Sequence, residues 1–413
     1  MPIHKTLFAA LSLFLFLGNL SAQNTNSPYS RYGFGTLENQ VMGKSRAMGG
    51  IGYGLREKGI INPLNPASYS AVDTMNLLFD FGLSASYYNF VEDGSSQGNP
   101  NAELDYLGIK IALKPNWGLV LGLVPYSNVG YSFGDSYTTR DMDNKKITYN
   151  KSYGGTGGLN TLFLGSSAKV TDNLSLGFNF KYIFGEITNY SSISSTYSNF
   201  SSQYFSQYWY LNALSLDLGA QYEIKFDKKH KATIGAVFTR KSSFSRGEVY
   251  EYTIGKDTTD NTTKYKFGLP NTLGAGFTYT YDNRLTVGMD YQMQAWSKSP
   301  YFNKKDSLSD NTRISFGLEY LPSLITTNYF HAIRYRFGMQ YADSYINFPD
   351  GNIKSLGVTF GFGFPLKGQK SNLNISFEAG KLIVPNSSYI NENYYKIALD
   401  VAFNELWFFK QKL

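Results

Sequence analysis

The chain contains no cysteine among its 413 residues and only three histidines, His4, His230 and His331. Without cysteine it can form no disulfide, no thiolate metal site and no cysteine nucleophile. No histidine has a partner of metal-ligand type two to four residues further along, and a hydrolase of the membrane would need a histidine with serine or aspartate partners. The sequence therefore predicts no metal, no cofactor and no enzymatic activity.

Charge is also scarce, at 17% of the residues, and the formal net charge of +7 is spread along the chain. No basic stripe of the kind that binds nucleic acid is present. Glycine (40), tyrosine (34) and phenylalanine (31) are abundant instead, which an α-rich enzyme would not show. This composition favours an all-β protein.

The first 22 residues have the pattern of a secretory signal peptide. Lys5 precedes an apolar stretch from Leu7 to Leu20, and Ala22 allows cleavage before Gln23. The alternative, a membrane anchor, is disfavoured because the stretch is too short, and no later run approaches the ~18 apolar residues of a membrane helix. A secreted chain without such helices can still cross a membrane as a closed barrel.

After residue 74, apolar and polar side chains alternate with a period of two in fourteen separate stretches. In the first of them, for example, Phe79, Phe81 and Leu83 are separated by Asp80 and Gly82. The stretches are 79–87, 107–113, 117–123, 162–168, 174–184, 214–222, 232–238, 273–281, 285–293, 314–320, 333–341, 356–364, 373–379 and 395–403. An even number of such strands predicts a fourteen-stranded antiparallel transmembrane β-barrel over residues 74–404.

The connections between these stretches alternate in length. Short turns are expected at 114–116, 171–173, 225–230, 282–284, 321–331 and 366–371. Long polar loops are expected at about 89–100, 133–156, 186–207, 242–264, 297–311, 342–352 and 381–393. In bacterial barrels the short turns face the periplasm and the long loops face outward. We therefore expect both mature ends, with a tail at 405–413, on the periplasmic side of a bacterial outer membrane.

The cost of placing charge in lipid fixes the expected facing of the strands. A lysine or arginine on the lipid face near the bilayer midplane costs roughly 2–4 kcal/mol, so the apolar stripes must face lipid. Twelve charged residues of the strands are then expected to face the lumen: Asp80, Lys110, Lys181, Asp217, Asp290, Arg313, Glu319, Arg334, Arg336, Glu378, Lys396 and Asp400.

Residues 23–73 lack this alternation and are rich in glycine. They could form a disordered tail or a plug inside the lumen. We favour the plug, because a barrel about fourteen strands wide is not filled by its own side chains. Two motifs stand out, Ser45-Arg46-Ala47-Met48-Gly49-Gly50 and Asn62-Pro63-Leu64-Asn65-Pro66-Ala67.

These two motifs resemble the hatch of FadL-type transporters of hydrophobic compounds. Leu269-Pro270, Trp296-Ser297 and the stretch from Gly317 to Pro322 are also similar to that family. The ending from Asn404 to Lys410 resembles that of Bacteroidota outer-membrane proteins. The resemblance implies passive transport of small hydrophobic molecules such as long-chain fatty acids. We favour that role, and the alternative is a non-transporting subunit or adaptor of an outer-membrane secretion or barrel-assembly complex.

Two features could serve the transport route that the resemblance implies. The first is the hatch residues Asn65, Pro66 and Ala67, although a rigid proline turn that merely starts the first strand is the alternative. The second is a possible lateral opening at Pro125, Asn128 and Gly130, where the alternation of the third strand is interrupted. An ordinary loop above the membrane is the alternative there.

Three arginines could hold a ligand carboxylate in the lumen: Arg313, Arg334 and Arg336. A structural pair between Glu319 and Arg334, which flank the same short turn, is the favoured alternative. A transporter should have a hydrophobic pocket and an opening in its wall, whereas a complex subunit should have a sealed wall. The partners expected are thus outer-membrane lipid and either a hydrophobic ligand or other membrane proteins, but not nucleic acid.

Overall fold

The computed structural model describes residues 27–74, 76–92, 94–140, 144–195, 201–254, 259–326, 328–366, 371–386 and 389–406. The predicted signal peptide lies outside these residues, as does the tail beyond Leu406. In the described parts of the chain, no helix is both long enough and apolar enough to cross a membrane.

The strands form one antiparallel sheet that closes on itself, as β18 pairs with β2 from Asn391↔Val91 to Leu406↔Asn76. Fourteen strands surround the lumen, which confirms the predicted fold. Twelve of them are β2 (Asn76–Glu92), β3 (Ser95–Lys114), β4 (Trp117–Arg140), β5 (Lys146–Lys169), β6 (Leu174–Ser195), β7 (Gln203–Lys225), β13 (Leu285–Gln294), β14 (Asn311–Tyr320), β15 (Arg334–Asp343), β16 (Lys354–Pro365), β17 (Asn372–Ile383) and β18 (Asn391–Leu406).

The seventh and eighth positions around the barrel are built from shorter pieces. The seventh consists of β8 (His230–Thr239) and β9 (Ser242–Ile254), which both pair with β7. The eighth consists of β10 (Thr259–Lys264), β11 (Gly268–Leu269) and β12 (Thr272–Tyr281). Here β12 pairs with β8, while β10 and β11 pair with β9.

The facing of the strands agrees with the prediction. Apolar side chains of the outward stripes are exposed on the barrel surface, such as Phe180 (49% exposed) and Leu216 (41%). The charged residues predicted for the lumen are buried or half-buried, and Asp400 is fully buried. Because successive side chains of a strand point to opposite faces, one correct facing fixes the whole strand.

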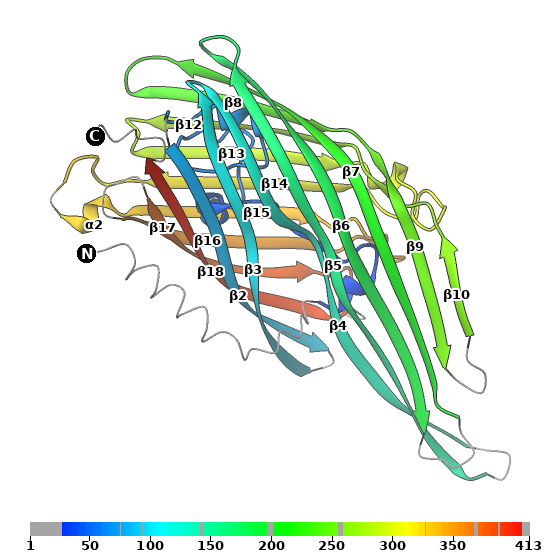
Figure 1. Ribbon diagram of the computed structural model, residues 1–413. Coiled ribbons are helices and arrows are strands. Elements are labelled where there is room, and N and C mark those ends of the chain that lie inside the picture. The colour runs from blue at the N-terminus through cyan, green and yellow to red at the C-terminus, as the bar shows by residue number, and fades with distance from the viewer. Residues whose placement is uncertain are drawn as a thin grey trace, which may run out of the picture.

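Many of the predicted long loops are in fact strand. The hairpin β4–β5 continues to Arg140 and Lys146, and β6 and β7 continue to Ser195 and Gln203. With β9 and β10, these extensions form an outer sheet that projects beyond the rest of the wall, at the end away from α2 (Figure 1). The prediction failed there because strands outside lipid need no apolar stripe, so their alternation disappears although their pairing continues.

At the opposite end the connections are short, as predicted. The connection between β14 and β15 contains one turn of helix, α2 (Tyr329–Ala332). The barrel starts at Asn76 and ends at Leu406, so the wall reaches two residues into the segment predicted as a tail.

Candidate functional site

The N-terminal segment, residues 27–74, lies against the inner face of the barrel. It contains three short 3-10 helices, η1 (Pro28–Arg31), η2 (Gly43–Met48) and η3 (Pro66–Ser70), and the short strand β1 (Thr36–Leu37). Its backbone comes so close to the wall that a methyl group added at Gly235 would overlap the carbonyl oxygen of Tyr53. One added at Gly338 would overlap the backbone at Gly49. Inward-facing glycines of the strands thus make room for this segment.

Asn65, Pro66 and Ala67 form one of the attachment points of this segment. The Asn65 side chain caps η3, accepting a hydrogen bond from the Ala67 N–H (3.1 Å). Its amide donates to the carbonyl oxygens of Tyr53 (2.7 Å) and Ala220 (3.1 Å), the latter on β7. All three predicted hatch residues are buried, which makes this turn a rigid anchor between the segment and the wall.

The barrel wall separates between β3 and β4. Their shared ladder runs from Lys114↔Trp117 to Leu107↔Leu123, and within the described residues β3 from Ser95 to Tyr106 pairs with β2 alone. Just beyond the end of this ladder, the pairing of β4 with β5 shifts register between Pro125 and Ser127. The irregularity therefore begins at the proline that interrupts the sequence pattern, as expected for a residue without an N–H to donate.

The other two residues predicted for a lateral opening have different surroundings. The Asn128 amide donates to Glu38 Oε1 (3.1 Å) and Glu103 Oε2 (3.3 Å). Gly130 is not among the glycines with positive φ. The unusual backbone lies opposite, on β5, where Gly157 and Gly158 have φ of 108° and 144°.

The free edge of β4 at this separation is covered by the N-terminal segment. Thr36 and Leu37 of β1 pair with Asn128 and Ser127. The Glu38 N–H donates to the Tyr126 carbonyl (3.0 Å), and the Ser27 N–H donates to the Gly130 carbonyl (3.1 Å). Sequence analysis missed these contacts, because a strand of two residues leaves no alternation to detect.

Ion pairs with the wall also hold the N-terminal segment inside the lumen. The carboxylate of Glu319, 2% exposed, contacts the Lys44 ammonium (3.1 Å) and the guanidinium groups of Arg336 (2.6 Å) and Arg334 (3.1 Å). The pair between Glu319 and Arg334 is therefore present, as the favoured interpretation expects. Arg313 lies apart from these two arginines and donates to Gln340 (3.3 Å).

A second charged cluster surrounds Arg46. Its guanidinium contacts Asp105 (2.7 Å) and Asp400 (3.2 Å), and Lys396 contacts Asp105 (3.2 Å) and Glu103 (3.1 Å). Arg46 belongs to the motif that carries the family resemblance, but its carboxylate partners lie on β3 and β18 and could not be found from the motif itself.

A cavity between the N-terminal segment and the barrel wall has a volume of about 260 Å³. Its lining combines apolar groups such as Val124 and Pro125 with many charged ones, among them Arg46, Arg313 and Lys396. Burial and the nearby carboxylates of Glu103 and Asp105 raise the pKa of Glu38, in the same cavity, to about 7. The sequence led us to expect an apolar pocket over the hatch, whereas the lining of this cavity is mixed and includes none of Asn65, Pro66 and Ala67.

Apolar groups gather nearer the end with the extended strands instead. Phe34 of the N-terminal segment is fully buried and contacts the rings of Phe244, Tyr301 and Trp296, with centroid distances of 5.4, 5.4 and 5.9 Å. Beside this cluster lies a cavity of about 370 Å³ with an aromatic lining that includes Trp209. Phe34 stands between two glycines in the sequence, which is the one signal that could have drawn attention to it.

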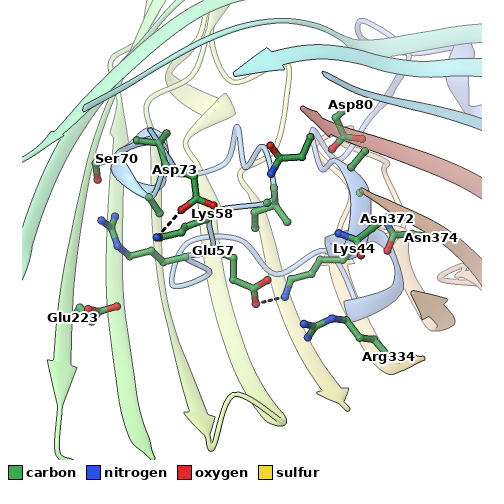
Figure 2. A pocket seen from close by; sticks show the side chains of 18 of the residues that line it. Lys44, Glu57, Lys58, Ser70, Asp73, Asp80, Glu223, Arg334, Asn372 and Asn374 are labelled. Carbon is green, nitrogen blue, oxygen red and sulfur yellow. Dashed lines mark hydrogen bonds and ion pairs between the residues drawn. The ribbon is translucent and has the colours of Figure 1, made fainter. Parts of the chain in front are cut away.

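A larger cavity, of about 560 Å³, lies at the end with the short turns (Figure 2). Arg334 and Arg336 line it together with lysines and asparagines of the wall. In the close-up, Lys58 points to Asp73 and Lys44 points to Glu57. The lining is polar, and no cluster of three or more metal-ligating side chains occurs among the described residues.

Solved structures with a similar fold include a FadL homologue, a toluene transporter and a hydrocarbon channel. The FadL homologue of Pseudomonas aeruginosa has a TM-score of 0.59 at 12% identity, over 90% of this chain and 99% of that one. The toluene transporter TodX of Pseudomonas putida has a TM-score of 0.58 at 16% identity, over 91% and 100%. The monoaromatic hydrocarbon channel CymD has a TM-score of 0.58 at 13% identity, over 89% and 97%. No curated protein matches the sequence.

Strand order and closure together define this protein as a fourteen-stranded antiparallel β-barrel, with the same fold as these solved structures. The model of one protein family, BamG, matches residues 3–413. The chain therefore belongs to the BamG family.

Proposed function

We propose that this barrel is a non-transporting subunit of an outer-membrane complex, of the secretion or barrel-assembly kind. One observation carries the proposal: the N-terminal segment covers the edge of β4 where the wall separates. A sealed wall is the property that distinguishes a complex subunit from a transporter. Membership of the BamG family supports the same conclusion.

Opening this seal would cost free energy, and contacts with a hydrophobic solute would not compensate for it. The backbone bonds from Ser27 and Glu38 to β4 would break, at roughly 0.5–1.5 kcal/mol each. The solute would then meet the Arg46 and Lys396 clusters, where it would displace polar contacts without replacing them. The barrel thus provides a rigid wall and an outer sheet rather than a route.

Passive transport of small hydrophobic molecules is the second candidate, and the outer aromatic cavity favours it. That cavity could take up a small aromatic molecule, and the β3–β4 ladder ends at Leu107↔Leu123, short of the ends of both strands. Transport of long-chain fatty acids would require the N-terminal segment to leave the edge of β4. The two candidates therefore differ in whether β1 must move.

A disulfide between β1 and β4 tests this difference. Glu38 and Tyr126 form a hydrogen-bonded position, so the neighbouring pair Leu37↔Ser127 is non-hydrogen-bonded and its Cα atoms should lie about 4.5 Å apart. That spacing suits a disulfide, and the natural chain has no cysteine to interfere. The variant Leu37→Cys/Ser127→Cys would be purified from native outer membrane in mild detergent, with each single variant as control.

Under our proposal the oxidised double variant retains the same co-purifying membrane proteins as the natural chain. Uptake of labelled toluene or fatty acid by cells should be the same whether or not the barrel is present. If instead the natural chain supports uptake, and oxidation of the double variant abolishes it while dithiothreitol restores it, the barrel is a transporter and our proposal is wrong. The absence of any co-purifying protein would also contradict it.

A further inference from the structure

The cavity at the short-turn end has an excess of positive charge. Eight cationic side chains and four carboxylates line it. The cations are Lys44, Arg56, Lys58, Lys169, Lys225, Lys231, Arg334 and Arg336, and the carboxylates are Glu57, Asp73, Asp80 and Glu223. Buried Glu319, behind the lining, neutralises part of the arginine side of this cavity.

The excess is concentrated on the wall formed by β5, β7 and β8. Lys58 has Asp73 as its partner (2.7 Å), and Lys225 has Glu223 (3.2 Å). Lys169 and Lys231 have no ion pair within the described residues. They therefore present charge to the cavity that the barrel does not balance.

Two further observations indicate that an anion belongs here. Lys225 and Lys231 are direct cross-strand partners, and like charges in this position destabilise a sheet. Arg56, half-buried, donates to the Ala67 carbonyl (3.0 Å) and to Gln221 (3.4 Å) rather than to a carboxylate. Burial lowers the pKa of this arginine, and the attraction of the Glu223 carboxylate offsets that effect only in part. An anionic ligand would reduce the repulsion between the two lysines and give the Arg56 guanidinium an ion-pair partner.

We propose that this cavity binds an acidic, extended peptide segment of a partner protein. The proposal rests on the proposed function as a complex subunit, and it names the chemistry of the partner. Side-chain carboxylates of such a segment would lie against Lys169, Lys231 and Arg56. The volume of about 560 Å³ is open at the mouth that carries the short turns, where a partner can reach it.

The mixed lining favours a peptide over a phosphate or a lipid headgroup. A phosphate group has only acceptor oxygens when ionised, and Glu57, Asp73 and Glu223 would repel it. A peptide also carries N–H donors, which these carboxylates can accept. Four asparagines of the lining, Asn116, Asn372, Asn374 and Asn404, offer both donors and acceptors to a peptide backbone.

The experiment measures binding of a labelled peptide to the purified full barrel in a non-ionic detergent. The probe alternates glutamate with glycine, and a matched peptide carries glutamine in place of glutamate. The variants are Lys169→Glu and Lys231→Glu, with Lys231→Gln as a milder change. The control is Lys228→Glu, which makes the same change of charge on an exposed residue of the adjacent turn that does not line the cavity.

We expect Lys169→Glu and Lys231→Glu each to weaken binding by about tenfold, while Lys228→Glu leaves it nearly unchanged. Binding should fall as salt is added. Equal binding of the glutamine peptide, equally effective competition by inorganic phosphate, or equal affinity of all variants would overturn the inference. If binding behaves as expected but no protein co-purifies from native membrane, the proposed function fails instead. If a partner co-purifies equally with the Lys231→Glu variant, the partner contacts the barrel elsewhere and this inference fails alone.

Discussion

Replacing Glu319 by glutamine should destabilise the barrel more than the loss of any other single lumen carboxylate. The carboxylate lies within 3.1 Å of three cations, Lys44, Arg334 and Arg336, and both Lys44 and Arg336 are almost fully buried with it. Glutamine keeps the size of the side chain and one acceptor oxygen, so little packing is lost. What is lost is the negative charge that allows three cations to share one site.

The expected cost is about 3–5 kcal/mol, the range measured when one partner of a buried ion pair is removed. Removing a cation from the variant should recover part of this loss. In the Glu319→Gln background, Arg336→Met removes a buried guanidinium that has lost its carboxylate partner, so the two changes should couple in a double-mutant cycle. Arg313→Gln is the matched control, because within the described residues the Arg313 side chain makes a single hydrogen bond, to Gln340 (3.3 Å). Its replacement should cost about 1 kcal/mol.

Urea unfolding of the refolded barrel in detergent micelles, followed by tryptophan fluorescence, gives the free energies of unfolding. Heat-modifiable mobility on SDS gels provides an independent measure of the folded fraction. A Glu319→Gln variant as stable as the Arg313→Gln control would refute the reasoning, as would additive effects of Glu319→Gln and Arg336→Met.

Three further predictions concern the seal, the wall and the anchor of the N-terminal segment. The raised pKa of Glu38 means that the folded protein binds its proton more tightly than the unfolded chain does, so attachment of β1 should be strongest in acid and weaken as pH rises through about 7. A spin label at Thr36→Cys should become more mobile over that range, and Glu38→Gln should abolish the change. Leu216→Arg should hinder assembly by roughly 2–4 kcal/mol in a membrane-insertion assay, whereas Leu216→Met should not, and equal behaviour would contradict the assigned facing. Asn65→Ala removes the cap of η3 and one hydrogen bond to each of the Tyr53 and Ala220 carbonyls, so we expect a loss of about 2–4 kcal/mol in urea unfolding. A loss near zero would mean that this turn does not anchor the segment.

The sequence alone was sufficient to predict the number of strands and their facing. Lipid allows few charges, so Phe180 and Leu216 must alternate with polar neighbours, and that alternation is visible without any tertiary information. The interruption at Pro125 was visible for the same reason, since proline breaks a pattern that is otherwise strict. The lengths of β4 to β7 were not predictable, because lipid no longer constrains their side chains beyond the membrane.

Only the tertiary structure decided how the N-terminal segment fits the lumen. Its contacts join residues far apart in the chain, such as Lys44 with Glu319, and its closest approaches are between backbone atoms at glycines such as Gly235 and Gly338. Neither kind of contact leaves a periodic signal. The same holds for the seal at β1, where backbone hydrogen bonds to Tyr126 and Gly130 depend on position and not on side-chain type. The type of each side chain reflects whether it faces lipid or water, and that information is present in the sequence. The pairing of distant backbone groups does not depend on side-chain type and is decided only when the barrel closes around them.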